Sequence, residues 1–223
     1  MAAFDFAHRP AALLFDMDGL LLDSERIARD AFLEVSEGMG PDRADREAFF
    51  LTLVGSSTRV TRERVAEYLP GADHAALEVR WDAAHDRLLA RGVPLRPGVA
   101  DSLDALRGQG VRMAVVTSTH RYRALERLET AEILHHFELV TGGDEVPAPK
   151  PDPAPYVQTA AALGLHPREC AAFEDSDRGI AAAMAAGCRG VQIPDRRPDG
   201  PRPALGQAVA TALPAARALF GLP

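Results

Sequence analysis

A short apolar run, Ala11–Phe15, stops abruptly at two carboxylates spaced by one residue, Asp16 and Asp18, and then at Gly19. An apolar run of this length that ends in a turn signal is typical of a buried strand in a parallel sheet. Because side chains alternate along an extended chain, Asp16 and Asp18 are expected on one side of it, at the carboxyl edge of the sheet. Open α/β sheets bind their ligands at that edge. On this stretch alone, a strand followed by an acidic turn without function remains an alternative.

Two different patterns divide the rest of the chain. Residues 23–93 show apolar residues at helical spacing and no convincing strand pattern, which predicts a small bundle of amphipathic helices. From Pro97 onward, short apolar runs alternate with helical patterns, and this alternation predicts a parallel sheet with right-handed crossovers. The expected helices of the bundle cover residues 24–38, 41–53, 60–69 and 73–92. The expected strands after Pro97 are Val111–Val116, Phe137–Thr141, Cys170–Phe173 and Gly190–Ile193.

The fold class that follows is α/β. We expect a Rossmann-like parallel sheet between two layers of helices, a three-layer αβα core, with an all-α four-helix cap domain inserted after the first strand. The core is expected to comprise residues 1–22 and 94–223, and the cap residues 23–93. A length of 223 residues suits one domain that carries a sizeable insertion.

Charge and cysteine content argue against several classes of partner. The formal net charge of −7 disfavours a surface that binds nucleic acid or an anionic membrane. Cys170 and Cys188 lie in apolar surroundings without metal-ligand spacing, so we expect reduced core residues and a cytoplasmic protein. The first residues do not resemble a signal peptide, and no apolar run is long enough to span a membrane. The expected partner is a small molecule, and both a monomer and a homodimer remain open.

Reactive polar side chains follow several of the expected strands or lie in the loops between them. They are Asp16, Asp18, Thr117, Ser118, Lys150, Glu174 and Asp175. Because the carboxyl ends of parallel strands lie side by side, these groups are expected to converge. Two carboxylates about 4 Å apart repel by roughly 4 kcal/mol at an effective dielectric near 20, so one lysine cannot offset several of them and a divalent cation is needed. Oxygen-only ligands favour Mg²⁺ over Zn²⁺.

Each of these residues also has an ordinary explanation. A threonine at a strand end is often a cap, and a lysine in a loop is often a solvated surface charge. As an ordered set, however, they fit phosphoryl transfer: a carboxylate nucleophile next to Mg²⁺, with a hydroxyl and an ammonium group to hold phosphate oxygens. Asp18 would be placed to protonate the leaving group and later to deprotonate a water molecule.

The sequence resembles the haloacid dehalogenase (HAD) superfamily, specifically its phosphatase and β-phosphoglucomutase-like branch with a small helical cap of the C1 type. The resemblance rests on four motifs, which are FDMDGLLLDSE at Phe15–Glu25, VVTST at Val115–Thr119, KPDPAPY at Lys150–Tyr156 and FEDSDRGIAAAMAAG at Phe173–Gly187. It implies a HAD-type phosphoric monoester hydrolase that uses Mg²⁺ and acts on a small phosphate ester, such as a phosphosugar or a similar metabolite.

The resemblance also implies a role for each motif residue. Asp16 would be the nucleophile that forms an aspartyl-phosphate, and Asp18 the general acid and base. Thr117 and Lys150 would act on the phosphate, as catalytic and substrate-binding residues, with Ser118 beside them. The implied Mg²⁺ ligands are Asp16, the carbonyl group of Asp18 and Asp175, with Glu174 in a supporting position.

Two other functions remain as alternatives to hydrolysis. Relatives of the β-phosphoglucomutase type carry a His on the first cap helix and a Lys just before the cap glycine. Here these positions are Ala28 and, if Gly55 is the cap glycine, Val54, which argues against a phosphosugar mutase. A receiver-like phospho-signalling module uses a similar set of side chains. The inserted cap and the position of Asp18 two residues after Asp16 favour the enzyme.

Substrate selection is expected in the cap. Gly55 and Arg59, with Arg62 one turn further on, form a polar, glycine-containing connection that could contact the substrate. The alternative, that these arginines line a solvated helix face, is equally open. The histidines, including the adjacent His135 and His136, are expected to be surface or structural residues and to provide no metal-ligand set.

Overall fold

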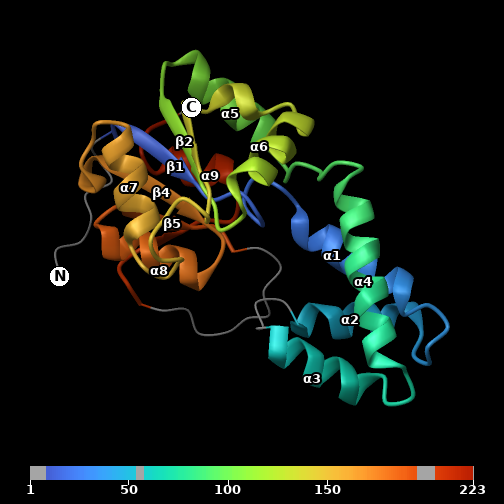
Figure 1. The fold of residues 1–223 in the computed structure, drawn as a ribbon. Coiled ribbons are helices and arrows are strands. Elements are labelled where there is room, and N and C mark those ends of the chain that lie inside the picture. Colours follow the sequence, from blue (N-terminus) through green and yellow to red (C-terminus); the bar gives the residue numbers. More distant parts are fainter. Residues whose placement is uncertain (1–8, 54–57, 195–203, 223) are drawn as a thin grey trace. The chain divides into compact units, whose positions relative to one another are not determined.

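The computed structural model describes residues 9–53, 58–194 and 204–222 of the chain, and these residues form two compact units (Figure 1). The core unit contains residues 9–23, 94–194 and 204–222, and the helical unit contains residues 24–53 and 58–93. Among the residues that the structure describes, Asp23 is the one that changes unit relative to the expected division. Its backbone N–H donates to the carbonyl oxygen of Pro94 at 2.8 Å, which ties it to the core. Gly55, expected in the substrate site, lies outside the described residues.

The core unit is built on a six-stranded sheet in which all neighbouring strands are parallel (Figure 1). The strand order is β3-β2-β1-β4-β5-β6, so β1 lies in the interior of the sheet between β2 and β4. The strands are β1 (Ala12–Phe15), β2 (Arg112–Val116), β3 (Leu139–Thr141), β4 (Cys170–Glu174), β5 (Arg189–Gln192) and β6 (Ala208–Val209). The expected α/β class with a parallel sheet is confirmed.

β1, β2, β4 and β5 lie within one residue of their expected bounds at each end, whereas β3 and β6 differ from the expectation by more. β3 begins at Leu139 rather than Phe137, because residues Leu134–His136 form a 3-10 turn (η1) and the N–H of Phe137 donates to the carbonyl oxygen of Leu134 at 3.1 Å. β6 is not predicted by the sequence. It has only two residues, Ala208–Val209, and these are too few to show an alternating pattern.

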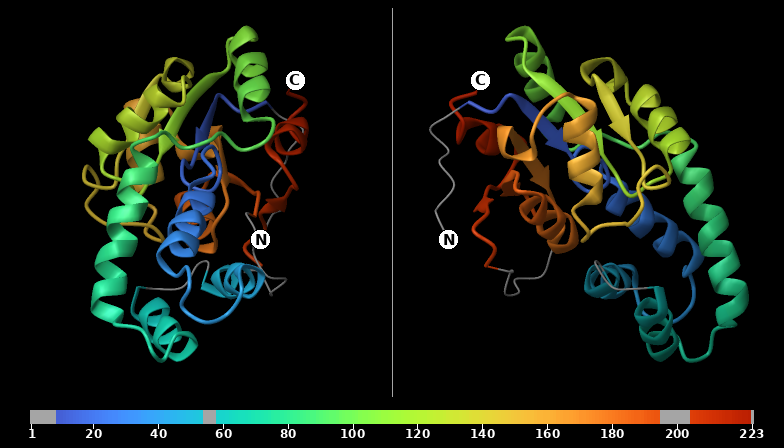
Figure 2. Two further views of the ribbon diagram at one scale, coloured as in Figure 1. Left: turned by 90° about the vertical axis from the view of Figure 1, so that its right-hand side faces the viewer. Right: turned by 60° about the vertical axis from the view of Figure 1, so that its left-hand side comes forward.

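Helices cover both faces of the sheet (Figures 1 and 2). The chain steps from β2 to β3 through α6 (Arg121–Thr130), after α5 (Val99–Gly108) has led into β2. It then steps in the opposite direction, from β3 to β4 through α7 (Ala154–Ala162) and from β4 to β5 through α8 (Asp177–Ala186). With right-handed crossovers, the two directions place α5 and α6 on one face and α7 and α8 on the other. The reversal occurs beside β1, where α/β sheets open a ligand crevice at their carboxyl edge.

The residues of β1 pack alternately into the layers on its two faces. Leu14 belongs to a buried cluster that also contains Tyr156 of α7. Phe15 packs on the other face, where its ring stacks on that of Phe173 with a centroid distance of 5.0 Å. All four residues of β1 are completely buried, as the continuous apolar run predicts for a strand covered on both faces.

In the described part of the helical unit, four amphipathic helices overlap the four expected ranges. They are α1 (Ser24–Val35), α2 (Arg43–Leu53), α3 (Thr58–Tyr68) and α4 (His74–Leu89). The ring of Phe32 lies at the centre of their core, 5.0 Å from the ring of Trp81 and 5.8 Å from that of Phe50. Asp73 caps α4, and its Oδ1 accepts a hydrogen bond from the N–H of Ala76 at 3.1 Å.

The two ends of the helical insertion are held together by backbone hydrogen bonds of the core unit. Leu22 and Leu95 form an antiparallel bridge, flanked by the bond from Asp23 to Pro94. The N–H of Arg96 donates to the carbonyl oxygen of Leu21 at 2.9 Å. The chain therefore leaves and re-enters the core through one short two-stranded ribbon.

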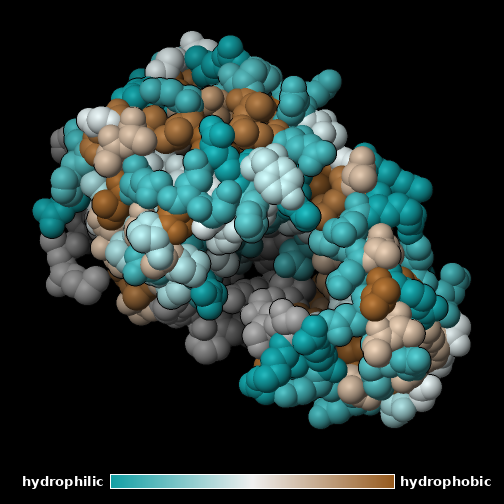
Figure 3. All heavy atoms as spheres, viewed as in Figure 1, coloured by the Kyte–Doolittle hydropathy of each residue, from teal (hydrophilic) through white to brown (hydrophobic). Residues whose placement is uncertain are grey.

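The surface is mostly polar on the face shown in Figure 3, with hydrophobic residues in separate groups. Large exposed hydrophobic side chains lie on different elements, for example Tyr122 on α6 and Val157 on α7. Within residues 9–53, 58–194 and 204–222, the structure contains no helix with the length and apolar character needed to cross a bilayer.

Both cysteines are unpaired and buried. Cys170 begins β4 and Cys188 precedes β5, and both belong to the apolar cluster beneath α7 and α8. Burial raises the pKa of the Cys170 thiol to about 11 and that of the Cys188 thiol to about 12. Both thiols therefore stay protonated and unreactive near neutral pH, as expected of core residues.

Candidate active site

A cavity of about 210 Å³ opens at the carboxyl edge of the sheet, next to the position where the chain reverses direction. It collects residues from four separate stretches of the chain. Its lining residues are Asp16, Asp18, Thr117, Ser118, Lys150, Asp175, Ser176, Arg178 and Gly179. All the core residues expected in the site are among them except Glu174, which is completely buried.

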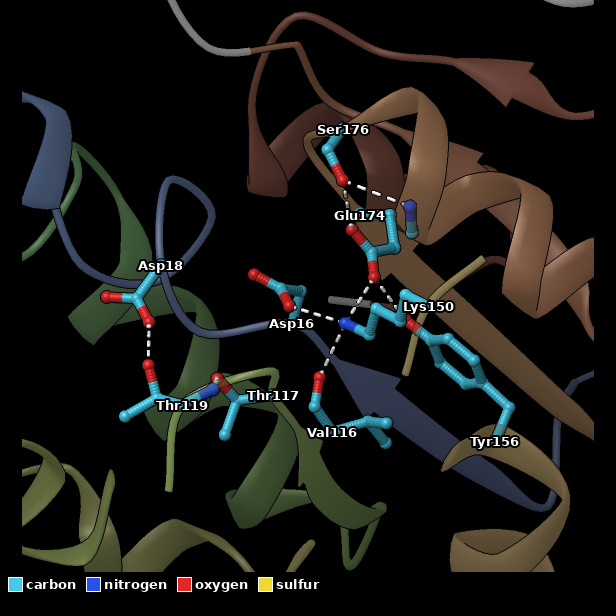
Figure 4. Close-up of polar contacts among 10 residues, drawn as sticks. Asp16, Asp18, Val116, Thr117, Thr119, Lys150, Tyr156, Glu174 and Ser176 are labelled. Carbon is cyan, nitrogen blue, oxygen red and sulfur yellow. Dashed lines mark hydrogen bonds and ion pairs between the residues drawn. The ribbon is translucent and has the colours of Figure 1, made fainter. Parts of the chain in front are cut away.

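Asp16 follows β1 directly and is held firmly by its surroundings. Its N–H continues the ladder to β4 by donating to the carbonyl oxygen of Phe173 at 3.0 Å. Its Oδ1 accepts a hydrogen bond from Nζ of Lys150 at 2.6 Å (Figure 4). With only 7% of its surface exposed, Asp16 presents a fixed carboxylate to the cavity.

Lys150 connects three parts of the site. Besides Asp16, its Nζ donates to Oε1 of Glu174 at 2.6 Å and to the carbonyl oxygen of Val116 at the end of β2 at 2.8 Å (Figure 4). These bonds use all three donors of the ammonium group. Burial alone would lower the pKa of Lys150, but the carboxylates of Asp16 and Glu174 raise it above its ordinary value, so the side chain is positively charged.

Glu174 forms the floor of the site. Its Oε1 also accepts a hydrogen bond from the hydroxyl group of Tyr156 at 2.5 Å, and its Oε2 accepts one from Oγ of Ser176 at 3.4 Å. A Cβ atom on Gly179 would lie 2.0 Å from this carboxyl group, which explains why a glycine occupies the first turn of α8. Tyr156 is a site residue that sequence reasoning missed, although it is the last residue of the motif that begins at Lys150.

Thr117 and Ser118 follow β2. The N–H of Thr117 donates to the carbonyl oxygen of Thr141 at 3.0 Å, and its Oγ1 accepts a hydrogen bond from the N–H of Thr119 at 3.0 Å. Thr117 is therefore buried in a tight turn, whereas Ser118 is exposed. A Cβ atom on Gly143 would lie 2.3 Å from the carbonyl oxygen of Ser118, so the neighbouring loop approaches this turn closely.

Asp18 is held by residues that lie far from it in the sequence. Its Oδ2 accepts a hydrogen bond from Oγ1 of Thr119 at 2.8 Å, and its Oδ1 accepts one from Nη1 of Arg127 on α6 at 3.1 Å. Figure 4 shows its side chain turned toward Thr119 and away from Asp16. Sequence reasoning also missed Arg127, which belongs to none of the motifs, and Thr119, whose motif was recognised without assigning it a role.

Three carboxylates lie close enough together to hold a metal ion. Asp16, Glu174 and Asp175 each offer one oxygen atom, and these atoms lie within 4.8 Å of one another. Gly19 makes room for this group, since a Cβ atom there would lie 2.3 Å from Oδ2 of Asp175. The carboxylate of Asp18 is not part of the group.

The electrostatics of this group favour an added cation. Burial raises the pKa of Asp16 to about 8, and the charges of Glu174 and Asp18 act in the same direction, while Lys150 opposes them. The positive charge of one lysine therefore does not fully stabilise the ionised form of Asp16 near neutral pH. Oxygen ligands without histidine or cysteine are the set that hard divalent cations prefer, so the residues fit Mg²⁺.

The cap residues expected to contact substrate form ion pairs within the helical unit. Arg59 on α3 donates to Oε1 of Glu63 at 2.6 Å, and Arg62 pairs with Glu78 of α4. Both arginine side chains are exposed. These contacts fit the alternative of a solvated helix face, and a role in substrate selection remains a proposal.

A second group of possible metal ligands lies elsewhere in the core unit. His135 and His136 of η1 and Asp104 of α5 offer donor atoms within 4.8 Å of one another. From the sequence we expect no metal-ligand set among the histidines, and the sequence does not predict that His135 and His136 lie close to Asp104. Asp104 and His135 are exposed and His136 is buried, which is also the arrangement of an ordinary contact between η1 and α5.

The sequence of residues 13–193 matches the family of haloacid dehalogenase-like hydrolases. The chain belongs to this family. Protein CbbY of Rhodobacter capsulatus is 36% identical to it over 193 residues, which cover 82% of this chain and 85% of the relative. Phosphorylated carbohydrates phosphatase of Thermotoga maritima is 31% identical over 179 residues, covering 79% and 81% of the two chains.

A solved structure extends the similarity to the fold. The crystal structure of a HAD family hydrolase from Deinococcus radiodurans R1, with bound phosphate and sodium, superposes with a TM-score of 0.75 at 30% identity, covering 97% of this chain and 96% of the other. Together these relatives confirm the expected superfamily and branch. They also confirm the expected enzyme class, a HAD-type phosphoric monoester hydrolase.

Proposed function

We propose that this hydrolase removes the phosphate group from a small phosphorylated sugar or a similar metabolite, with Mg²⁺ as cofactor and an aspartyl-phosphate on Asp16 as intermediate. The observation that carries the proposal is the position of Asp16, a buried carboxylate paired with Lys150 at 2.6 Å and grouped with Glu174 and Asp175. The name of the Thermotoga maritima relative supports a phosphorylated carbohydrate as the substrate class.

The residues of the site divide the chemistry between them. Asp16, Asp175 and Glu174 are the candidate metal ligands, with the carbonyl group of Asp18 as a further one. Mg²⁺ bound there would offset the charge of the carboxylates and of the phosphate. Oε1 of Glu174 already accepts a hydrogen bond from Lys150. We therefore assign Glu174 chiefly to positioning Lys150 and to supporting the metal ligands. The turn at Thr117 and Ser118 would bind the phosphate oxygens. Lys150 would contribute its positive charge to phosphate binding, because its three donors already bind Asp16, Glu174 and the carbonyl oxygen of Val116.

Two proton transfers complete the proposed reaction. An oxygen of Asp16 forms a bond to phosphorus as the ester oxygen leaves, and Asp18 gives that oxygen a proton. Asp18 then takes a proton from a water molecule, whose oxygen attacks phosphorus and releases Asp16 and inorganic phosphate. Asp18 loses a proton in the first step and regains one in the second, so its protonation state is restored after each turnover.

A phosphosugar mutase is the competing function within the same family. A mutase returns the phosphoryl group to its product, whereas a phosphatase passes it to water. Ala28, which stands where mutase-like relatives carry a His, packs against the core of the helical unit, and its carbonyl oxygen accepts a hydrogen bond from Nε1 of Trp81 at 3.4 Å. A methyl side chain cannot exchange protons, which favours hydrolysis. The second mutase position, Val54, lies outside the described residues.

The test is phosphate release from a panel of phosphometabolites in the presence of Mg²⁺. The panel includes hexose, pentose and hexitol phosphates, and β-glucose 1-phosphate with its bisphosphate activator. We expect multiple turnovers on at least one sugar phosphate. We also expect Asp16→Asn to abolish turnover while Asp101→Asn, an exposed carboxylate on α5, leaves it unchanged.

Three results would contradict the proposal. Conversion of β-glucose 1-phosphate without net phosphate release would identify a mutase. A single phosphorylation event without turnover would identify a receiver-like module. Steady-state hydrolysis by folded Asp16→Asn would show that Asp16 is not the nucleophile. Mass spectrometry of acid-quenched enzyme would identify directly which residue carries the phosphoryl group.

A further inference from the structure

The Asp18 carboxylate is contacted by Arg127, which belongs to none of the motifs, and by Thr119, the last residue of the motif Val115–Thr119. Nη1 of Arg127 binds one oxygen atom and Oγ1 of Thr119 binds the other (Figure 4 shows the contact with Thr119). The Arg127 side chain is only 16% exposed and that of Asp18 is 31% exposed. A charged hydrogen bond between partly buried groups restricts both partners more than a surface ion pair does.

The direction of the Asp18 side chain matters for the chemistry. In phosphoryl transfer the attacking and leaving oxygens lie roughly in line on opposite sides of the phosphorus atom. If Asp16 attacks, the leaving oxygen is on the side of the phosphorus away from Asp16. A group that gives this oxygen a proton must therefore be held away from the nucleophile, and Figure 4 shows Asp18 turned away from Asp16.

Without Arg127, other charges would act on Asp18. The charge of Asp18 contributes to the environment of Asp16, so the two carboxylates lie near enough to interact. Lys150 is a cation in the same cavity and would attract a free Asp18 side chain toward the floor of the site. Arg127 supplies a competing positive charge from α6, bound directly to the Asp18 oxygen that Thr119 does not contact.

We propose that Arg127, assisted by Thr119, is a positioning residue that holds the Asp18 carboxyl group on the leaving-group side of the site. The inference rests on the proposed phosphatase function. In the step concerned, the bond between phosphorus and the ester oxygen breaks, a bond between phosphorus and Asp16 forms, and the proton of the Asp18 carboxyl group moves to the ester oxygen. Arg127 touches none of the reacting atoms and acts through Asp18.

The experiment compares two classes of ester. An alkyl phosphate, such as a sugar phosphate, needs a proton on its leaving oxygen, whereas p-nitrophenyl phosphate has a leaving group that departs as a stable anion. We expect Arg127→Met to lower kcat on the sugar phosphate by about 10- to 100-fold with little change in KM. On p-nitrophenyl phosphate the expected loss is less than about threefold.

The matched control is Arg123→Met, which removes the same charge from an exposed position one turn earlier on α6 and should leave both activities unchanged. Arg127→Lys keeps the charge and should recover part of the lost activity. Thr119→Val should show the same selective loss in a milder form. Because Arg127 acts through Asp18, the double variant Asp18→Asn, Arg127→Met should be no slower than Asp18→Asn alone.

The outcomes separate this inference from the proposed function. If the wild-type enzyme hydrolyses neither class of ester, the proposed phosphatase function fails. If it hydrolyses both, and folded Arg127→Met loses the two activities equally or loses neither, the positioning role is overturned. Should Arg127→Met fail to fold, Thr119→Val and Arg127→Lys decide the question by the same comparison, and equal effects on both esters reject the role.

Discussion

Gly179 offers a sharp test of how the floor of the active site is built. The substitution Gly179→Ala adds one methyl group, whose carbon atom would lie 2.0 Å from the carboxyl group of Glu174. Because an ordinary contact needs about 3.4 Å, Glu174 or the start of α8 has to move by about 1.4 Å. A shift of this size would stretch the 2.6 Å bond from Lys150 to Glu174 beyond hydrogen-bonding distance.

The expected cost follows from these contacts. Overpacking of a filled site costs about 1–3 kcal/mol, and the loss of a charged hydrogen bond adds about 1.5–3 kcal/mol. We therefore expect Tm to fall by at least about 5 °C for a chain of this length. Since Lys150 also holds Asp16, we expect kcat/KM on the best sugar phosphate to fall by about 100-fold or more.

The assay pairs thermal unfolding with steady-state phosphate release. The control is Gly108→Ala at the end of α5, where no atom outside its local helix lies within 4 Å of an added Cβ atom. That variant should keep its activity and be as stable as the wild type or slightly more stable, because alanine favours helix. Wild-type Tm and activity in Gly179→Ala would refute the account of a tightly packed floor under Lys150.

Three further predictions concern neighbouring groups. Tyr156→Phe removes the hydroxyl donor to Glu174 and should lower the free energy of unfolding by about 1–3 kcal/mol in urea titrations. Chelation by EDTA should abolish hydrolysis and Mg²⁺ should restore it, and Asp175→Asn should raise the Mg²⁺ concentration for half-maximal activity by at least about tenfold. Burial lowers the pKa of His136 below its usual 6.5, so the unfolded chain takes up a proton first and stability should be lost as the pH falls below 6.5. His136→Gln should show a shallower loss between about pH 7 and pH 5, and parallel stability curves would contradict this assignment.

The convergence of the core motifs was predictable because it depends on a general property of parallel sheets. Asp16, Thr117 and Asp175 each follow the end of a strand, and the carboxyl ends of these strands meet at one edge. The bounds of α8 were predictable for a local reason. Ser176 caps the helix, and Gly187 ends it in the left-handed conformation with φ of 94°.

What the sequence does not reveal depends on tertiary contacts. Arg127 lies 109 residues from Asp18, and no feature of its local sequence distinguishes it from the other arginines of α6. Glu174 is a strand-end carboxylate like the others, and only its burial and its bonds to Lys150 and Tyr156 show that it supports the site. The terminal helix α9 (Leu213–Ala218) has six residues, too few for a periodic pattern.

The two-stranded ribbon at Leu22 and Leu95 has a consequence for how such enzymes diversify. A backbone hydrogen bond of 2.8 Å joins Asp23 to Pro94. The two points at which the insert joins the core therefore stay next to each other, whatever the length or sequence of the insert. A lengthened or exchanged insert adds loop-closure entropy only slowly, by about 0.6 kcal/mol for each doubling of its length. The junction therefore works as an acceptor site for interchangeable modules, and a chimera that carries another family member's helical insert between Asp23 and Pro94 should retain a folded catalytic core.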